Sequence, residues 1–303
     1  MNTTARLAGF GGALVLLAAG GFAVGNAAGP VSAATNENTG HGDMGSEHAG
    51  MTAPVADLPG GLASSKDGYT FAVADATPEP GRFSFTITGP DGKPVTGFDV
   101  EHEKKLHLIV VRRDTAGFQH VHPEMAPDGT WSVPLTLPAA GSYRAFADFT
   151  PAGGKAMTLG TDLSVAGDYR PATYATSRTA QVDGYTVELA GDLTAGKTSP
   201  LTLTVSRGGA PVTDLQPYLG AYGHLVALRE GDLAYLHVHP DGAPGDGKTA
   251  AGPEVKFAAE VPSAGTYRLF LDFRHGDVVR TAEFTLTTAG SPAAPTPSDG
   301  HGH

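Results

Sequence analysis

The sequence predicts an all-β protein built from two tandem immunoglobulin-like β-sandwiches, preceded by an N-terminal apolar segment, and three observations support this. The 303 residues include 42 Gly and 23 Pro, which favour turns over long helices. Short stretches of alternating polar and apolar residues recur at intervals of about 8–12 residues, as in such sandwiches. The same motifs also occur twice along the chain, which indicates an internal duplication.

The duplication is visible in two sets of matching motifs. Pro94-Val95-Thr96 recurs 117 residues later as Pro211-Val212-Thr213, and Gly141-Ser142-Tyr143-Arg144 recurs 124 residues later as Gly265-Thr266-Tyr267-Arg268. The difference of seven residues falls in a stretch rich in Gly, Pro and Asp, residues 241–252, which is typical of a surface loop. Each repeat has the size of one independent domain.

The motifs and the composition divide the chain into six parts. They are a signal peptide or membrane anchor (1–33), a disordered linker with His and Met (34–62), the first sandwich (63–167), a linker (168–180), the second sandwich (181–289) and a disordered His-containing tail (290–303).

Seven strands are expected in each repeat. Those of the first are 69–73, 82–88, 106–113, 118–122, 131–137, 143–149 and 157–165, with a turn at Gly89-Pro90-Asp91-Gly92. Those of the second are 185–189, 201–206, 224–229, 233–239, 255–261, 267–273 and 278–287. A small barrel or a cupredoxin-like sandwich fits the same pattern.

The N-terminus indicates export. Arg6 precedes an apolar segment, residues 7–25, and Val31-Ser32-Ala33 follows as a cleavage site. The segment is longer than the usual apolar region of a signal peptide and close to the length of a spanning helix. We therefore expect an extracytoplasmic protein, either secreted or held to the membrane by residues 7–25.

Charge and composition exclude several classes of function. A net charge of −11 argues against nucleic acid as a partner, since phosphate binding needs a basic surface. The chain has no Cys, which excludes disulfides, thiolate metal sites and cysteine nucleophiles. It also lacks a nucleophile elbow, a phosphate-binding loop and an HExxH motif, so no enzymatic activity is expected.

A three-histidine pattern occurs once in each repeat with identical spacing. The two sets are His107, His120 and His122, and His224, His237 and His239. A hairpin around Gly231-Asp232 would pair Leu228 with Tyr235, Val226 with His237 and His224 with His239, which places all three imidazoles on one face. Equal spacing extends this geometry to the first set.

Three imidazoles on one face predict a metal site in each repeat. Nitrogen ligands suit copper or zinc ions, and we expect copper first and zinc second. Asp148 and Asp272 would serve either as a fourth ligand or as an acceptor for a ring N–H. His102 is not counted among the ligands, because the second repeat has Leu219 at its position. The His and Met residues of the two tails add to the metal interpretation.

The competing interpretation is a metal-free, Ig-like surface or interaction module. In that case the histidines are structural residues of the sandwich, with their nitrogens bonded to backbone carbonyls or aspartate. A shift of one residue in strand register would also move His107 to the other face.

Two segments of the chain resemble a known group of proteins. They are His107-Leu108-Ile109-Val110-Val111 with His120-Val121-His122-Pro123, and Tyr218 to Leu225 with the second His-Val-His-Pro. The chain resembles exported actinobacterial proteins of the heavy-metal-binding type and is similar, more distantly, to YtkA-like domains linked to copper handling. The resemblance covers roughly residues 60–289 and implies an Ig-like fold outside the cytoplasm. The long methionine motifs of copper chaperones are absent.

Overall fold

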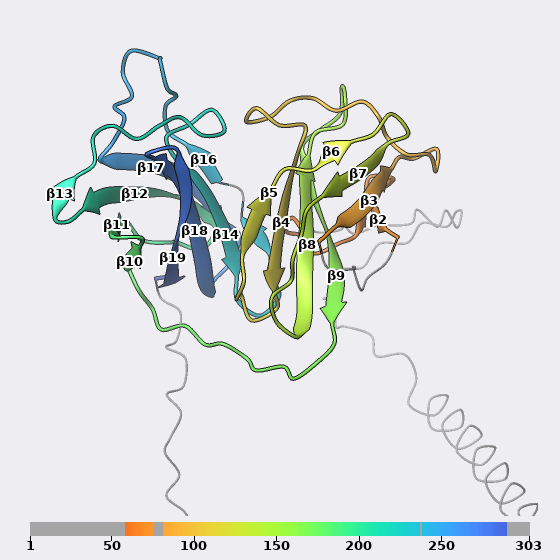
Figure 1. Cartoon of the computed structure of the whole chain (residues 1–303), viewed down its shortest axis with the longest axis horizontal. Helices are drawn as coiled ribbons and strands as arrows, with labels where there is room; N and C mark the ends of the chain where they lie inside the picture. Colours follow the sequence, from red (N-terminus) through yellow and green to blue (C-terminus); the bar gives the residue numbers. More distant parts are fainter. Residues whose placement is uncertain (1–57, 75–80, 237, 290–303) are drawn as a thin grey trace, which may run out of the picture. The chain divides into compact units, whose positions relative to one another are not determined.

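The computed structural model describes residues 58–74, 81–236 and 238–289. They form two β-sandwiches, orange to green and green to blue in Figure 1. Within these residues, no helix has the length and apolar character needed to cross a membrane. The predicted signal or anchor segment, both His-containing tails and His237 lie outside the described residues.

The first repeat has an outer sheet and an inner sheet, which faces the second repeat. The outer sheet has the order β1 (Ser65–Lys66), β2 (Tyr69–Val73), β3 (Phe83–Thr88), β7 (Thr130–Val133) and β6 (Glu124–Met125). The inner sheet has the order β5 (Gln119–Val121), β4 (Leu106–Arg112), β8 (Gly141–Phe149) and β9 (Met157–Val165).

The second repeat has the same plan. Its outer sheet has the order β10 (Thr179–Val182), β11 (Tyr185–Ala190), β12 (Lys197–Arg207), β17 (Glu254–Val261) and β16 (Val238–Pro240), with β13 (Ala210–Pro211) also paired to β12. Its inner sheet has the order β15 (Tyr235–Leu236), β14 (His224–Arg229), β18 (Thr266–His275) and β19 (Val278–Thr287).

This arrangement confirms the all-β class and the duplication. All the pairings are antiparallel, and the strand order of each repeat is that of an Ig-like sandwich rather than a barrel. One predicted strand is wrong as a unit: residues 233–239 divide between β15 and β16, which belong to opposite sheets. The short strands β1, β6, β10 and β13 were not predicted, because two to four residues carry too little periodicity.

A tyrosine at the start of the strand before last marks both repeats. Tyr143 donates its hydroxyl to the carbonyl of Ala139 at 2.8 Å, and Tyr267 donates to the carbonyl of Ser263 at 2.8 Å. In each case the acceptor lies four residues upstream, as in the tyrosine corner of immunoglobulin-like domains.

The inner sheets are buried on both faces. On β4, Leu106, Leu108 and Val110 point into the core of the first repeat, while Ile109 and Val111 belong to a separate cluster with the second repeat. A strand alternates its side chains between two faces, so a run buried throughout must be covered on both sides. The histidine at position 107 therefore lies on the face that looks away from its own sandwich core.

The two repeats pack through equivalent residues. The shared cluster contains Ile109, Val111, Phe146, Val226, Leu228, Leu233 and Phe270. Phe118 stacks on Phe270 with ring centres 4.0 Å apart, and the equivalent pair, Tyr235 and Phe146, has centres 5.7 Å apart. Each repeat thus gives the other the same kind of contact, as in a two-fold symmetric interface.

The segment before the first repeat joins the two inner sheets. Gly60 accepts a hydrogen bond from the backbone of Tyr235 in the second repeat, and Gly61 donates one to Thr158 on β9. Gly160 permits this approach, because a Cβ there would lie 2.0 Å from the Gly61 carbonyl oxygen. The buried guanidinium of Arg144 also donates to that carbonyl, at 2.6 Å.

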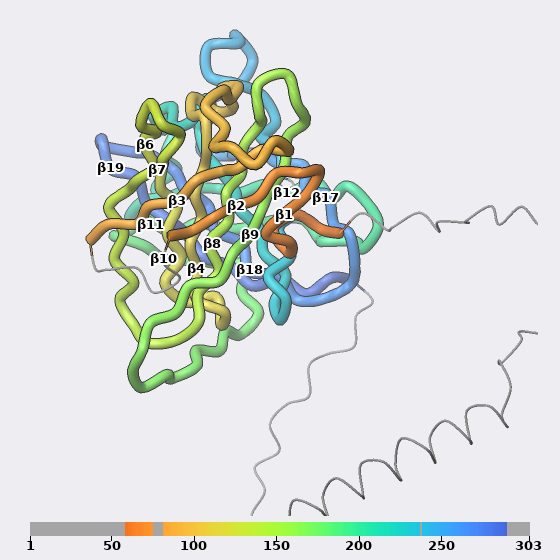
Figure 2. The backbone as a smooth tube through the Cα atoms, turned by 90° about the vertical axis from the view of Figure 1, so that its right-hand side faces the viewer, coloured from red at the N-terminus to blue at the C-terminus, as the bar shows by residue number. Residues whose placement is uncertain are grey.

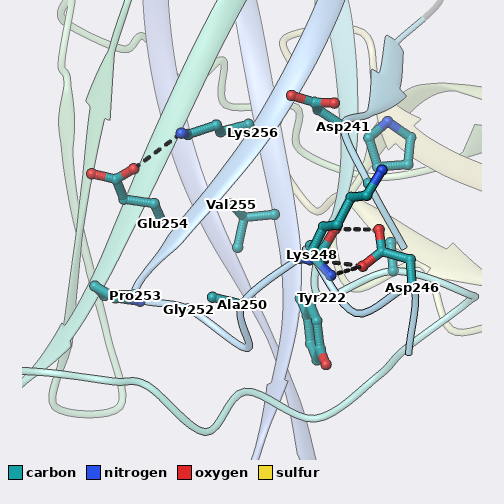
Figure 3. A pocket seen from close by; sticks show the side chains of 14 residues that line it. Tyr222, Asp241, Asp246, Lys248, Ala250, Gly252, Pro253, Glu254, Val255 and Lys256 are labelled. Carbon is teal, nitrogen blue, oxygen red and sulfur yellow. Dashed lines mark hydrogen bonds and ion pairs between the residues drawn. The ribbon is translucent and has the colours of Figure 1, made fainter. Parts of the chain in front are cut away.

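The seven-residue insertion of the second repeat lies in the loop between β16 and β17, light blue at the top of Figure 2. Asp246 organises this loop by accepting the backbone N–H groups of Lys248 and Thr249, each at 2.7 Å. The loop borders a hollow whose lining includes Tyr222 and Lys256 (Figure 3). None of the histidines in the described part of the chain lines this hollow, so it is separate from the histidines described next.

Candidate metal site between the two repeats

The first set of histidines lies on the predicted face. β5 pairs with β4 so that His120 is opposite Ile109 and Val121 is opposite Leu108. This is the predicted register, and the ring centres of His107 and His122 lie 5.0 Å apart. The hairpin thus presents its three imidazoles toward the second repeat.

The second set does not assemble in the predicted way. Leu228 pairs with Tyr235 as expected, but the strand crosses to the outer sheet after Leu236, and His239 is opposite Ala258 on β17. His239 is exposed there, and the predicted pairing of His224 with His239 is therefore wrong. The physical reason is the sheet switch, which a local hairpin count cannot reveal.

His224 instead joins the histidines of the first repeat. One nitrogen each from His107, His120 and His224 lies within 4.8 Å of the other two. The His224 ring centre is 5.4 Å from that of His107 and 4.8 Å from that of His120. Two imidazoles bound to one ion at a tetrahedral angle have ring centres about 5 Å apart, given a metal–nitrogen bond of about 2 Å. The spacing therefore suits one shared ion.

Hydrogen bonds fix which nitrogens face the centre of this group. Asp272 of the second repeat accepts from Nδ1 of His120 at 2.8 Å, and its other oxygen accepts from Thr281 at 2.6 Å. Nε2 of His107 donates to the carbonyl of Glu101 at 3.1 Å. The remaining nitrogens, Nδ1 of His107 and Nε2 of His120, lie 3.1 Å apart.

Those two nitrogens are both acceptors when the rings are neutral. A neutral imidazole carries one N–H, and in each of His107 and His120 that N–H is already donated elsewhere. Two lone pairs 3.1 Å apart repel unless a proton or a cation lies between them. Two nitrogens on one ion lie about 3 Å apart, so this distance also fits metal ligands.

Burial keeps three of these histidines, His107, His122 and His224, uncharged at neutral pH. Desolvation, followed by repulsion from neighbouring rings, lowers the pKa of His107 to about 4 and that of His122 to about 3. The same causes lower the pKa of His224 well below its ordinary value. Nε2 of His122 is buried and has no hydrogen-bond partner within the described structure. Metal ions bind neutral imidazole, so these rings are in the binding form at neutral pH.

A cavity of about 310 Å³ opens beside the group. Its lining residues include Asp148, His102, His107, His224 and His239. Asp148 accepts a hydrogen bond from Thr158 at 2.9 Å, as its counterpart Asp272 does from Thr281. His102 was not among the predicted ligands, yet its ring centre is 5.5 Å from that of His224. His102 was not predicted as a ligand because the ligands were chosen for occurring in both repeats, and the second repeat has Leu219 at this position.

The fold and the site together define a two-domain, Ig-like β-sandwich protein with a histidine group between its domains. A family model matches residues 64–167 and 180–290, and the chain belongs to this family, a domain of unknown function (DUF8832). No curated protein matches the chain.

Several solved structures are similar at low identity. One is a protein from Corynebacterium diphtheriae described as membrane-anchored (13% identity, 76% of this chain, 61% of that chain, TM-score 0.22). Another is Salmonella alpha-2-macroglobulin (13%, 77% of this chain, 15% of that chain, 0.25), and a third is invasin, a bacterial integrin-binding protein (15%, 72%, 39%, 0.20). The chain spans less than two thirds of the length of each.

Proposed function

We propose that this protein binds one transition-metal ion in the histidine group between its repeats. The observation that carries the proposal is the convergence of nitrogens from His107, His120 and His224 within 4.8 Å, with the lone pairs of the first two facing each other. His122 is the proposed fourth ligand, because its ring centre lies 4.8 Å from that of His120 and its Nε2 is buried without a hydrogen-bond partner among the described residues. Asp272 then acts behind His120, orienting its ring and raising its basicity, rather than as a ligand.

The proposed ion is copper, with zinc second. The donors are imidazole nitrogens, and thiolates are absent from the chain, which suits Cu(II), Zn(II) and Ni(II). Among these, the general order of divalent affinities places Cu(II) highest. The proposal is one of binding, without catalysis. It places the protein outside the cytoplasm, on the strength of the N-terminal apolar segment, residues 7–25.

The second candidate is a metal-free interaction module. A proton between His107 and His120 would also relieve the facing lone pairs, and His120 would then be an imidazolium paired with Asp272. This arrangement explains those two rings. It leaves the buried Nε2 of His122 without a role, which is why we favour the metal.

Calorimetric titration of the full chain, purified without an affinity tag, tests the choice. Wild type should bind Cu(II) or Zn(II) at least about tenfold more tightly than the H120A/H122A variant or H224A. H275A is the matched control, because His275 bonds to Tyr185 and Asp214 outside the group and should leave affinity unchanged. If all four proteins bind the metal with equal affinity, the measured binding comes from the His-containing tails, and the proposed site is wrong.

A further inference from the structure

One turn beside the group has an unusual backbone. Glu101 and Lys104 exchange two backbone hydrogen bonds, of 2.8 and 3.0 Å, which closes a two-residue turn. The two central residues, His102 and Glu103, have φ of 48° and 66°. Such turns normally hold Gly or Asn, because side chains are unfavourable in the left-handed region. Strained backbone of this kind is often retained where a side chain has a function.

The equivalent turn of the second repeat has a similar backbone but no histidine. There Tyr218 and Ala221 close the turn, and its central residues are Leu219 (φ 55°) and Gly220 (φ 75°). Leu219 is buried in the protein, whereas its counterpart His102 is exposed. The first repeat thus holds an exposed imidazole where its sister holds a core residue.

The turn also places this imidazole beside the group. The His102 ring centre lies 5.5 Å from that of His224 and 6.1 Å from that of His107. It lines the 310 Å³ cavity together with both of those residues. The carbonyl of Glu101, in the same turn, accepts the N–H of His107. His102 is therefore an imidazole of the cavity that reaches solvent and lies next to two proposed ligands.

We propose that His102 is an entry ligand, which captures the metal ion from solvent and passes it to the buried histidines. The inference rests on the proposed function. A hydrated ion would exchange one water for a nitrogen of His102, and then further waters for His224 and His107. His102 leaves the ion when His120 and His122 complete the set. The buried donors alone would require the ion to lose several waters before its first protein bond.

The sister turn supplies the variants for the test. H102L installs the residue that the second repeat tolerates at this backbone, and E103G installs the glycine while keeping the imidazole. Binding of Cu(II) to the full chain is followed by stopped-flow quenching of the single tryptophan, Trp131. H102L should bind about tenfold more slowly with a nearly unchanged dissociation constant, whereas E103G should bind at the wild-type rate.

Each other outcome has a distinct meaning. If wild type binds Cu(II) and H102L binds at the same rate, the entry role is wrong while the site stands. A loss of equilibrium affinity in H102L equal to its loss of rate also overturns the entry role. Equal slowing in E103G would assign the effect to the turn rather than to the imidazole. If wild type shows no binding beyond that of H120A/H122A, the proposed site itself fails.

Discussion

His107 and His224, which occupy the same position in the two repeats, stack on each other with ring centres 5.4 Å apart and planes 9° apart. Residues related by an internal duplication meet only where its two copies face each other. The stack therefore places the histidine group at the junction of the repeats. It follows that neither repeat alone holds the complete group, and that the proposed metal binding would be linked to the packing of the two repeats.

The link can be tested at Asp272, which reaches across the junction to His120. D272N removes the carboxylate that holds the N–H of His120, and such supporting contacts are typically worth about 10–100-fold in metal affinity. We expect a loss of that size for Cu(II) by calorimetry. D214N is the matched control, since it alters an exposed Asp–His pair with His275 and should have no effect. Equal affinities for the two variants would contradict the supporting role.

Packing between the repeats should influence the site. F270A removes a fully buried ring that stacks on Phe118 and should cost about 3–5 kcal/mol of the free energy of unfolding in urea. F284A deletes an equally buried ring from the core of the second repeat and should cost a similar amount. Only F270A should weaken metal binding. An equal loss of metal affinity in both variants would show that general destabilisation, not the junction, controls the site.

The segment before the first repeat should matter for stability in the same region. G160A places a methyl group 2.0 Å from the Gly61 carbonyl oxygen, so the segment must move and loses its bonds to Arg144. We expect a lower midpoint of thermal unfolding. The control is G97A, where the nearest atom is 3.2 Å away and is a side-chain methyl. An unchanged midpoint in G160A would mean that the segment does not pack as described.

Stability of the metal-free protein should depend on pH. The lowered pKa values of His107 (about 4) and His122 (about 3) mean that the unfolded chain, with ordinary values near 6.5, binds protons first as pH falls. Stability is therefore highest above pH 6.5 and falls progressively below it, down to about pH 4 for His107 and about pH 3 for His122. Urea midpoints at pH 7 and pH 5 measure it. An H107L/H122L variant should show a weaker dependence, and an identical dependence would refute the assignment to these rings.

Much of the fold could be predicted because its signals are local. β2, β9, β14 and β19 have the expected bounds, and the register of β5 on β4 placed His120 and His122 on the face of His107. The part of the predicted histidine site that was wrong depends on contacts between residues far apart in the sequence. The switch of sheets after Leu236 separated His239 from His224, and no local pattern encodes it.

The junction itself was also missed, although one signal for it was present. Residues 106–111 are all apolar apart from His107. They lack the alternation of polar and apolar residues that is typical of a strand with one solvent-exposed face. Such a run shows that something covers the second face. It does not show that the cover is the other repeat.

Metal stoichiometry tests the central claim most directly. One site across the junction predicts a single tightly bound Cu(II) or Zn(II) per full chain by native mass spectrometry. That one ion should be lost both in H120A/H122A, altered in the first repeat, and in H224A, altered in the second. Two tightly bound ions in wild type, with one lost in each variant, would contradict the shared site and restore a separate site in each repeat.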